Sequence, residues 1–203
     1  MKKSTLSFLA IPVLLAAGVS AAEAEAVCHP GDGPYASIGI GISKTQHWKS
    51  DATRAETHFR TAPNFRVAVG SQFSNYRAEF EPSYSNAKYT VGGTKGHANI
   101  TSTLGNIYVG LPFEGSLISY PTAPYLGAGI GFSSVKANFS PIQVQNQGHN
   151  TVLSYQGIAG VRFALNKQVG LNLEYRYFST EKLNYVGKRI EAHSANLGLT
   201  YRF

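Results

Sequence analysis

The sequence predicts an all-β protein, an eight-stranded antiparallel transmembrane β-barrel with up-and-down topology. Three observations support this fold. Eight strand-length runs alternate apolar and polar residues, the connections between them are alternately short and long, and an export signal precedes them all. After that signal no apolar run reaches the roughly 18 residues that a membrane-spanning helix needs, so a membrane protein of this sequence would cross with strands.

Residues 1–26 are typical of a secretory signal peptide. A basic start precedes an apolar run at 6–19, and small residues follow up to Ala26. We expect cleavage after one of the alanines in this stretch, leaving 27–203 as a single barrel domain. Cys28 is the only cysteine, so an internal disulfide is excluded. It is either an unpaired thiol or a lipid-modified cysteine, and Val27 before it argues against the modification.

Four runs in the first half of the chain repeat every second residue, as a strand with two different faces does. They span 35–43, 65–73, 76–84 and 103–111. In the first run, Ile38, Ile40 and Ile42 face one way, opposite serine and glycine. The tight turn at Ser74-Asn75 joins the second run to the third, so we expect a hairpin there.

Four further runs complete the predicted barrel. They span 125–132, 155–163, 169–177 and 192–203. In the last run, Leu197, Leu199, Tyr201 and Phe203 share one face. Aromatic residues at the end of an apolar face are typical of a lipid-facing strand that reaches the membrane interface.

The connections predict the orientation of the barrel. The turns 74–75 and 165–168 are short, and 112–123 is the longest connection on the same rim. The connections on the other rim are longer and polar: 44–64, 85–99, 133–151 and 179–189. This asymmetry predicts periplasmic termini and extracellular loops. The alternative fold is a soluble lipocalin-like barrel, which would turn its apolar face inward.

Six charged residues lie on the polar, inward-facing side of the predicted strands. They are Arg66, Arg77, Glu79, Glu81, Glu174 and Arg176. The lumen of an eight-stranded barrel is only wide enough to be filled by side chains. Isolated charges are costly there, whereas paired arginine and carboxylate groups are tolerated. We therefore expect a plug of ion pairs and little conductance. The inward glycines at 127, 129 and 131 leave room for long neighbours and lack the spacing of a phosphate-binding loop.

Four segments resemble the small outer-membrane β-barrel superfamily, which includes opacity proteins, neisserial surface protein A, Ail-type and OmpA-like barrels. They are Ala123-Pro-Tyr-Leu-Gly-Ala-Gly, Gly157-Ile-Ala-Gly-Val-Arg-Phe, Leu173-Glu-Tyr-Arg-Tyr and Leu199-Thr-Tyr-Arg-Phe. The resemblance implies the outer membrane of a Gram-negative bacterium and no cofactor. It also implies surface adhesion, serum resistance, or binding of lipopolysaccharide and glycans.

The long loops carry most of the excess charge of a chain whose formal net charge is +7. The first and fourth loops should emerge side by side, because the first and last strands are neighbours in a closed barrel. We predict one basic patch there with aromatic anchors: Lys44, Trp48, Lys49, Arg54, Phe59, Arg60, Lys182, Tyr185, Lys188 and Arg189. Such a rim suits the phosphates of lipopolysaccharide or a sulfated or sialylated glycan.

The sequence favours an interaction protein over an enzyme. A lipid A-modifying site would need histidine, a hydroxyl and a carboxylate together, and the nearest candidates are His193, Ser194 and Glu191. Neighbouring residues of a regular strand point to opposite faces, so His193 and Ser194 cannot share a site. The histidine spacings do not indicate a metal site. We expect a monomer whose partners are outer-membrane lipids, lipopolysaccharide and host-cell surface glycans or proteins, without nucleic acid. A structural barrel and a small low-conductance porin are the alternatives.

Overall fold

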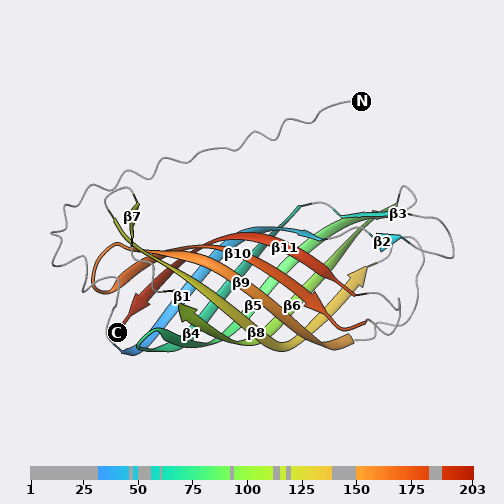
Figure 1. Cartoon of the computed structure of the whole chain (residues 1–203). Helices are drawn as coiled ribbons and strands as arrows, with labels where there is room; N and C mark the ends of the chain where they lie inside the picture. Colours follow the sequence, from blue (N-terminus) through green and yellow to red (C-terminus); the bar gives the residue numbers. More distant parts are fainter. Residues whose placement is uncertain are drawn as a thin grey trace.

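The structure, a computed structural model, describes residues 32–45, 48–49, 56–59, 61–91, 94–111, 115–117, 120–138, 150–182 and 189–203. These residues form eleven strands (Figure 1). They are β1 (Gly33–Thr45), β2 (Trp48–Lys49), β3 (Glu56–Phe59), β4 (Ala62–Phe73), β5 (Tyr76–Val91), β6 (Thr94–Gly110), β7 (Gly115–Leu117), β8 (Tyr120–Asn138), β9 (Asn150–Ala164), β10 (Val169–Thr180) and β11 (Glu191–Arg202). No helix among the described residues is long and apolar enough to span a bilayer.

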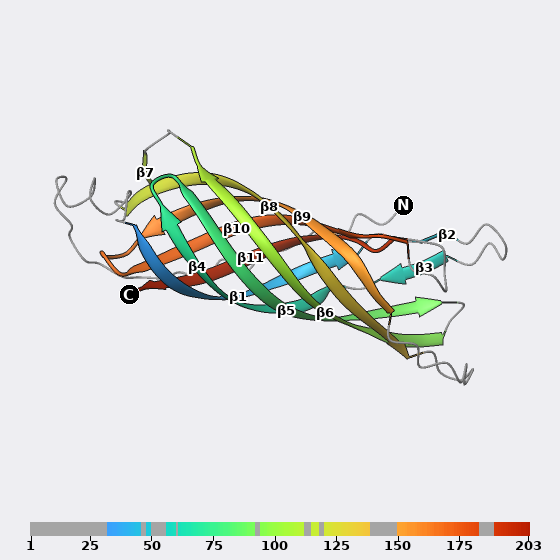
Figure 2. The ribbon, with the colours of Figure 1, turned by 90° about the horizontal axis from the view of Figure 1, so that it is seen from below.

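Eight long strands close into one antiparallel barrel, which confirms the predicted fold class. Going round the barrel, the order is β1, β4, β5, β6, β8, β9, β10 and β11, and β11 pairs again with β1. This last pairing, the seam, runs from Tyr35 opposite Arg202 to Thr45 opposite Ala192. Figure 2 shows that the long strands are strongly tilted relative to the barrel axis, as closure of a small barrel requires. β7 and the pair β2–β3 are short additions to this wall.

The two ends of the barrel differ. One end, here the turn end, holds the two-residue turn 74–75, the turn 165–168 and residue 203 (Figure 1). The other, the loop end, holds the β2–β3 pair, the ends of β8 and β10 and the beginnings of β9 and β11. Ser74 has a φ of 52°, a left-handed conformation in the tight hairpin between β4 and β5. Its backbone N–H donates to Asp32 Oδ1 at 2.5 Å.

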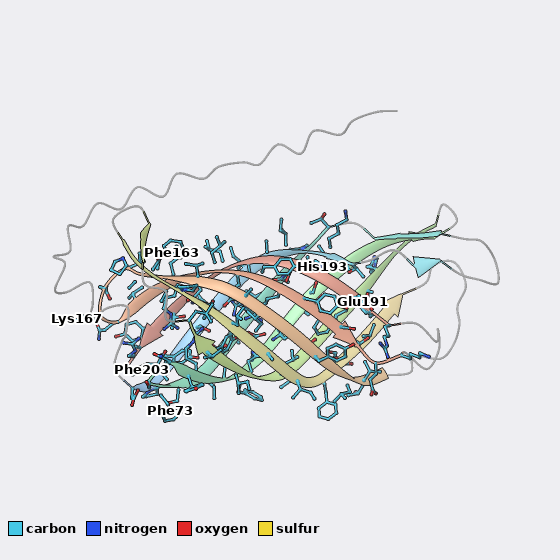
Figure 3. All side chains as sticks on the ribbon, in the orientation of Figure 1. Phe73, Phe163, Lys167, Glu191, His193 and Phe203 are labelled. Atoms are coloured by element: carbon cyan, nitrogen blue, oxygen red, sulfur yellow. The ribbon has the colours of Figure 1, made fainter. Side chains whose placement is uncertain are left out.

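Apolar side chains point outward and polar ones inward, as the alternation predicted. Ile107 is 69% exposed, while its neighbours Asn106 and Tyr108 are buried. Figure 3 shows side chains standing out all round the wall, with Phe73 and Phe203 at the turn end. Tyr201 and Phe203 contact edge to face, with ring centroids 5.5 Å apart. An apolar exterior with aromatic residues near its edge is typical of a barrel that lies in lipid, so the inward apolar face of a lipocalin-like barrel is not what this chain has.

The strands are longer than predicted, and the expected loop boundaries are wrong. β5 and β6 pair continuously up to Val91 opposite Thr94, so most of 85–99 is a strand hairpin. In the same way β8 extends to Asn138, and β2 and β3 occupy part of 44–64. The prediction depended on an apolar face. Beyond the bilayer the outward face of a hairpin meets water and needs no apolar residues, so hydrogen bonding between strands continues where the apolar face ends.

Candidate functional site

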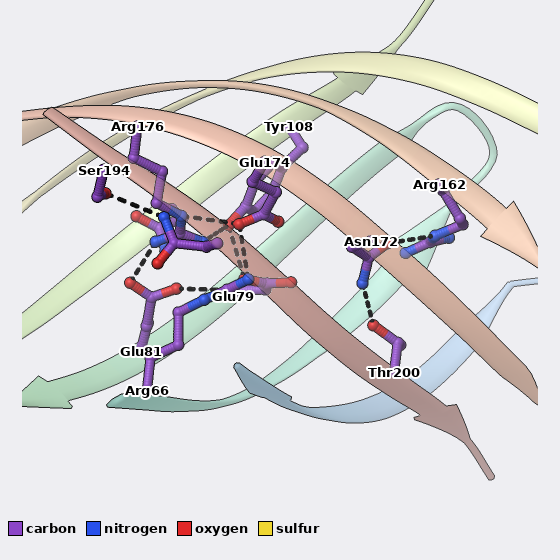
Figure 4. A network of polar contacts seen from close by, with 12 residues as sticks. Arg66, Glu79, Glu81, Tyr108, Arg162, Asn172, Glu174, Arg176, Ser194 and Thr200 are labelled. Carbon is purple, nitrogen blue, oxygen red and sulfur yellow. Dashed lines mark hydrogen bonds and ion pairs between the residues drawn. The ribbon is translucent and has the colours of Figure 1, made fainter. Parts of the chain in front are cut away.

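Two arginines and two glutamates meet in the middle of the lumen and form a closed ring of ion pairs (Figure 4). Arg66 Nη1 lies 3.3 Å from Glu81 Oε2, and Arg66 Nη2 lies 2.6 Å from Glu174 Oε2. Arg176 Nη1 lies 2.7 Å from Glu81 Oε1, and Arg176 Nε lies 2.8 Å from Glu174 Oε2. None of the four is more than 5% exposed. Each charge therefore contacts two opposite charges, and the ring is neutral as a whole.

This ion-pair ring spans the lumen. Glu81 is on β5 and Arg176 is on β10, which lie four strands apart in an eight-stranded barrel and so face each other across the lumen. Gln156, on β9, extends the contacts, because its Nε2 donates to Glu81 Oε1 at 3.3 Å and to Asn106 Oδ1 at 2.8 Å. These contacts join opposite walls at one level of the barrel.

A second set of contacts, on the turn side of the ring, depends on tyrosines. Glu79 accepts hydrogen bonds from the hydroxyls of Tyr35 at 2.7 Å and Tyr108 at 2.8 Å. Arg77 lies between the rings of Tyr108 and Tyr125, with its Cζ 4.4 Å from each centroid. The Tyr125 hydroxyl donates to Glu174 Oε1 at 2.6 Å and so connects this tyrosine cluster to the ring. The expected pairing of arginine with carboxylate is thus replaced here by cation–π contacts.

Glycines on nearby strands of the wall make room for these long side chains. A Cβ at Gly39 would lie 2.5 Å from Arg66 Nε, and one at Gly198 would lie 2.9 Å from Arg66 Nη2. Gly39 and Gly198 are opposite each other across the seam. Likewise a Cβ at Gly160 would lie 2.6 Å from the Tyr125 ring. A side chain at these positions would collide with Arg66 or Tyr125, so the glycines determine how tightly the lumen is filled.

The turn end of the lumen contains a third set of contacts, centred on Arg162. Figure 4 shows Arg162, Asn172 and Thr200 set apart from the ring. Arg162 Nε donates to Asn172 Oδ1 at 3.3 Å, and Nη1 donates to Gln72 Oε1 at 3.2 Å. Asn172 Nδ2 donates to Thr200 Oγ1 at 2.7 Å. The side-chain partners of Arg162 in the described part of the chain are therefore neutral amides.

The loop end of the lumen is partly open and partly filled. A vestibule of about 640 Å³, which includes space open to solvent, lies on the loop side of the ring and has Arg66, Glu81 and Arg176 in its lining. Most of its other lining residues carry hydroxyl or amide groups.

The wall of the loop end is held by a serine chain and an apolar cluster. Three buried serines on β6, β8 and β9 are hydrogen-bonded in a row: Ser102 to Ser133 at 2.7 Å and Ser133 to Ser154 at 2.6 Å. An apolar cluster of Ile100, Val135, Val152 and Ile190 fills the interior near the loop end.

The structure describes only some of the predicted ligand-binding residues. Lys44, Lys182 and Arg189 are exposed at the loop end. Lys44 is in β1, opposite His193 of β11. Trp48 and Lys49 lie in β2 and Phe59 in β3, so they belong to strands rather than to a loop. The remaining four fall outside the described residues: Arg54, Arg60, Tyr185 and Lys188.

The groups considered for catalysis do not come together. The His193 ring contacts Tyr175, whose hydroxyl lies 2.6 Å from His193 Nδ1, on the outside of β10 and β11. Ser194 instead lines the vestibule, and its Oγ accepts from Asn196 Nδ2 at 2.9 Å. Glu191 begins β11, near the loop end (Figure 3). Among the described residues no cluster of three or more histidine, cysteine or carboxylate groups could hold a metal.

Sequence reasoning placed six charged residues in an interior network and left out a further arginine, Arg162, and the neutral and aromatic groups that contact them. The period of two predicts that these residues face inward, because each alternates with outward apolar residues. They are Tyr108, Tyr125, Gln156, Arg162 and Asn172. Which of them touch across the lumen was not readable, because contacts between opposite walls depend on the stagger of the strands.

Comparisons with known proteins agree with this architecture. The family described as outer membrane protein beta-barrel domain matches residues 9–203. Uncharacterized proteins of Brucella abortus, Brucella suis and Brucella melitensis are 28% identical over 160 residues, which is 74% of this chain and 52% of each relative. The chain thus spans about half the length of these curated relatives.

Two solved structures have a similar fold. Neisserial surface protein A superposes with a TM-score of 0.59 at 18% identity, covering 85% of this chain and 99% of that one. The outer membrane protein OprG from Pseudomonas aeruginosa gives a TM-score of 0.50 at 14% identity, covering 86% and 97%. At such identities the likeness shows the fold alone.

Proposed function

The chain belongs to the outer membrane protein β-barrel domain family, and from that premise we propose that it is a non-conducting, non-catalytic surface protein whose loop end binds anionic glycans. The ligand class comprises the phosphorylated sugars of lipopolysaccharide and sulfated or sialylated glycans of a host-cell surface. The barrel lies in the outer membrane of a Gram-negative bacterium, with the long connections outside and the short turns in the periplasm.

The observation that carries the proposal is the set of cations at the loop end of the seam. Lys44 is near the end of β1, Lys182 follows β10, and Arg189 precedes β11. All three are exposed, and β1, β11 and β10 are consecutive in the barrel wall. Exposed cations that emerge from neighbouring strands can act together on one polyanion, and their attraction decreases as salt increases.

Two carboxylates lie on the same rim and limit the excess charge. Glu181 is exposed next to Lys182, and Glu191 is half-buried at the start of β11. A patch of mixed sign favours discrete contacts with phosphate or sulfate groups over general attraction to any anionic surface. The proposal therefore predicts saturable binding of a defined glycan.

The filled lumen supports the non-conducting part of the proposal. The ion-pair ring joins β4 and β5 to β10 at mid-barrel, and its members are almost completely buried. A low-conductance pore is the second candidate, and the solvent-open vestibule on the loop side of the ring favours it. In planar-bilayer recordings we expect no steady open level. Sustained nanosiemens-scale channels would contradict the proposal and favour the pore.

Binding to immobilised heparin and lipopolysaccharide over a salt series tests the glycan site. We expect retention of the detergent-folded protein to fall with salt and to fall further in the double variant Lys182→Ala/Arg189→Ala. Lys136→Ala is the matched control, because Lys136 is an exposed cation of β8, away from the seam. Equal retention of the double variant and the wild type at every salt concentration would rule out the seam patch. Equal losses in the double variant and the control would mean general charge attraction.

A further inference from the structure

The turn end of the lumen has an unbalanced positive charge. Arg162 is 8% exposed, and its Nε and Nη1 donate to amide oxygens rather than to carboxylates. Its Nη2 has no hydrogen-bond partner among the described residues. Arg162 also experiences repulsion from Arg77 and Arg202. A buried charge of this kind is costly unless something of opposite charge compensates it.

A second arginine with an unpartnered nitrogen, Arg202, lies beside Arg162 at the turn end of the lumen. Arg202, at the end of β11, is half-buried, and its Nη1 donates to the backbone oxygen of Lys167 at 3.3 Å. Its Nε has no partner in the described part of the chain. Arg162, Arg202 and Lys167 line one open pocket, and none of the described residues lining it is a carboxylate. The pocket is shallow and open to solvent.

The two described carboxylates on the turn side of the ion-pair ring, Glu79 and Asp32, already accept hydrogen bonds. Both oxygens of Glu79 accept hydrogen bonds from tyrosine hydroxyls. Asp32 accepts from the backbone N–H of Ser74, in the hairpin between β4 and β5. The charge of Arg162 is therefore not compensated by an ion pair within the described residues, in contrast to the two arginines of the ring.

The turn that carries Lys167 is well ordered by hydrogen bonds. Asn166 Oδ1 accepts from the backbone N–H groups of Gln168 at 2.8 Å and Val169 at 2.7 Å. The Leu165 N–H donates to the Val169 oxygen at 3.0 Å. Figure 3 shows Lys167 at the tip of the turn end. The three cations thus come from two strands and one fixed turn, which is a preformed arrangement.

We propose that this pocket binds a phosphate group, with Arg162 at its base, Arg202 at its side and Lys167 at its mouth. Arginine forks suit the tetrahedral oxygens of phosphate, and lysine adds a point charge. The group comes either from a phospholipid headgroup of the periplasmic leaflet or from free phosphate, since the turn end faces the periplasm. The site is at the opposite end from the proposed glycan patch and does not depend on it.

Inorganic phosphate is the first probe. The full chain, folded in octyl glucoside, is titrated with phosphate or chloride at constant ionic strength while heat release and the thermal unfolding midpoint are measured. A ligand that binds only the folded state raises this midpoint by mass action. We expect phosphate to raise it above its value in chloride, and Arg202→Gln to weaken phosphate binding roughly tenfold, as loss of a charge-assisted contact does.

Three further variants make the result specific. Lys167→Gln should weaken binding less than Arg202→Gln, because Lys167 lies at the solvent-exposed mouth. Arg162→Gln should abolish binding, and the half-exposed Arg202 and exposed Lys167 provide the test if that variant does not fold. Lys136→Gln, an exposed cation at the loop end, should bind like the wild type.

Phosphatidylglycerol is the second probe, with uncharged diacylglycerol as its reference, and retention is measured by native mass spectrometry. Retention of the phospholipid by the wild type and its loss in Arg202→Gln identify the headgroup as the source of phosphate. An effect of free phosphate alone identifies the small anion. The proposal is overturned if neither probe binds, or if Arg202→Gln binds as the wild type does.

Discussion

The middle and the turn end of the lumen bury arginines in two different ways. In the middle, Arg66 and Arg176 each contact Glu81 and Glu174, and the charges balance. Toward the turn end, Arg77 lies between two aromatic rings and Arg162 contacts two amide oxygens. Both arrangements fill the barrel with guanidinium groups. Only in the middle do the positive and negative charges cancel. The loss of stability on removing a partner should therefore differ between the two regions.

The difference separates two uses of a buried charge. A neutral ring of ion pairs holds opposite walls together and has no residual attraction for an anion. Arginines held by neutral partners keep their charge available to a ligand. Substitutions in the two regions should therefore differ in their effect on stability.

Glu81→Ala should have the largest effect. It leaves Arg66 and Arg176 with only Glu174 between them, and it removes one of the two acceptors of Gln156 Nε2. An uncompensated buried charge lowers the free energy of unfolding by about 3–5 kcal/mol. Urea unfolding in lipid vesicles, followed by circular dichroism, measures it.

Ser83→Ala is the control for Glu81→Ala, since Ser83 is two residues away on the same face of β5 and lines the vestibule. It should change stability by about 0.5 kcal/mol or less. Equal unfolding midpoints for Glu81→Ala and the wild type would show that water compensates the ring charges.

Glu79→Ala should have a smaller effect, because the partners of Glu79 are hydroxyls and not guanidinium groups. Two buried tyrosine hydroxyls lose their acceptor, which lowers the free energy of unfolding by roughly 2–3 kcal/mol. The same urea titration gives the value. A loss as large as that of Glu81→Ala would contradict the distinction between the two regions.

Tyr108→Phe should cost about 1–2 kcal/mol, because it removes the hydroxyl that donates to Glu79 and keeps the ring over Arg77. Tyr108→Leu also removes the ring and should cost about 1 kcal/mol more through the lost cation–π contact. The comparison of the two urea midpoints isolates the aromatic contribution. If Phe and Leu destabilise equally, the ring does not hold Arg77.

Arg162→Gln should have the smallest effect on stability, about 1 kcal/mol or less in either direction, when no anion is present. The lost hydrogen bonds to Gln72 and Asn172 are offset by the removal of a charge that no carboxylate in the described part of the chain neutralises. Urea unfolding in phosphate-free buffer tests this. A loss of several kcal/mol would mean that Arg162 is compensated after all.

The period of two made the barrel predictable, because an apolar exterior and a polar interior force alternation in every strand. It assigned Arg66, Glu81, Glu174 and Arg176 to the inside, where the structure has them. It did not predict that Glu79 contacts tyrosines rather than arginines. Strand stagger decides which inward residues lie at the same height, and a sequence pattern within one strand contains no information on stagger.

The ends of the strands were less predictable than their middles. β5 continues to Val91 and β6 begins at Thr94, and both strands run through polar residues such as Ser85 and Asn99. The signal used for strands was amphipathicity, and it disappears where a hairpin leaves the bilayer. The candidate patch was inferred from the adjacency of the first and last strands, and that adjacency follows from closure alone.

The contact between Arg66 and Glu174 has a consequence for the order of assembly. The two residues are 108 positions apart in sequence and lie on β4 and β10, on either side of the seam. An open sheet with every other strand pairing intact would hold them at distant positions. Their bond therefore cannot form until the first and last strands have met. The Arg66 guanidinium, which packs over Gly39 and Gly198, therefore stabilises only the closed barrel.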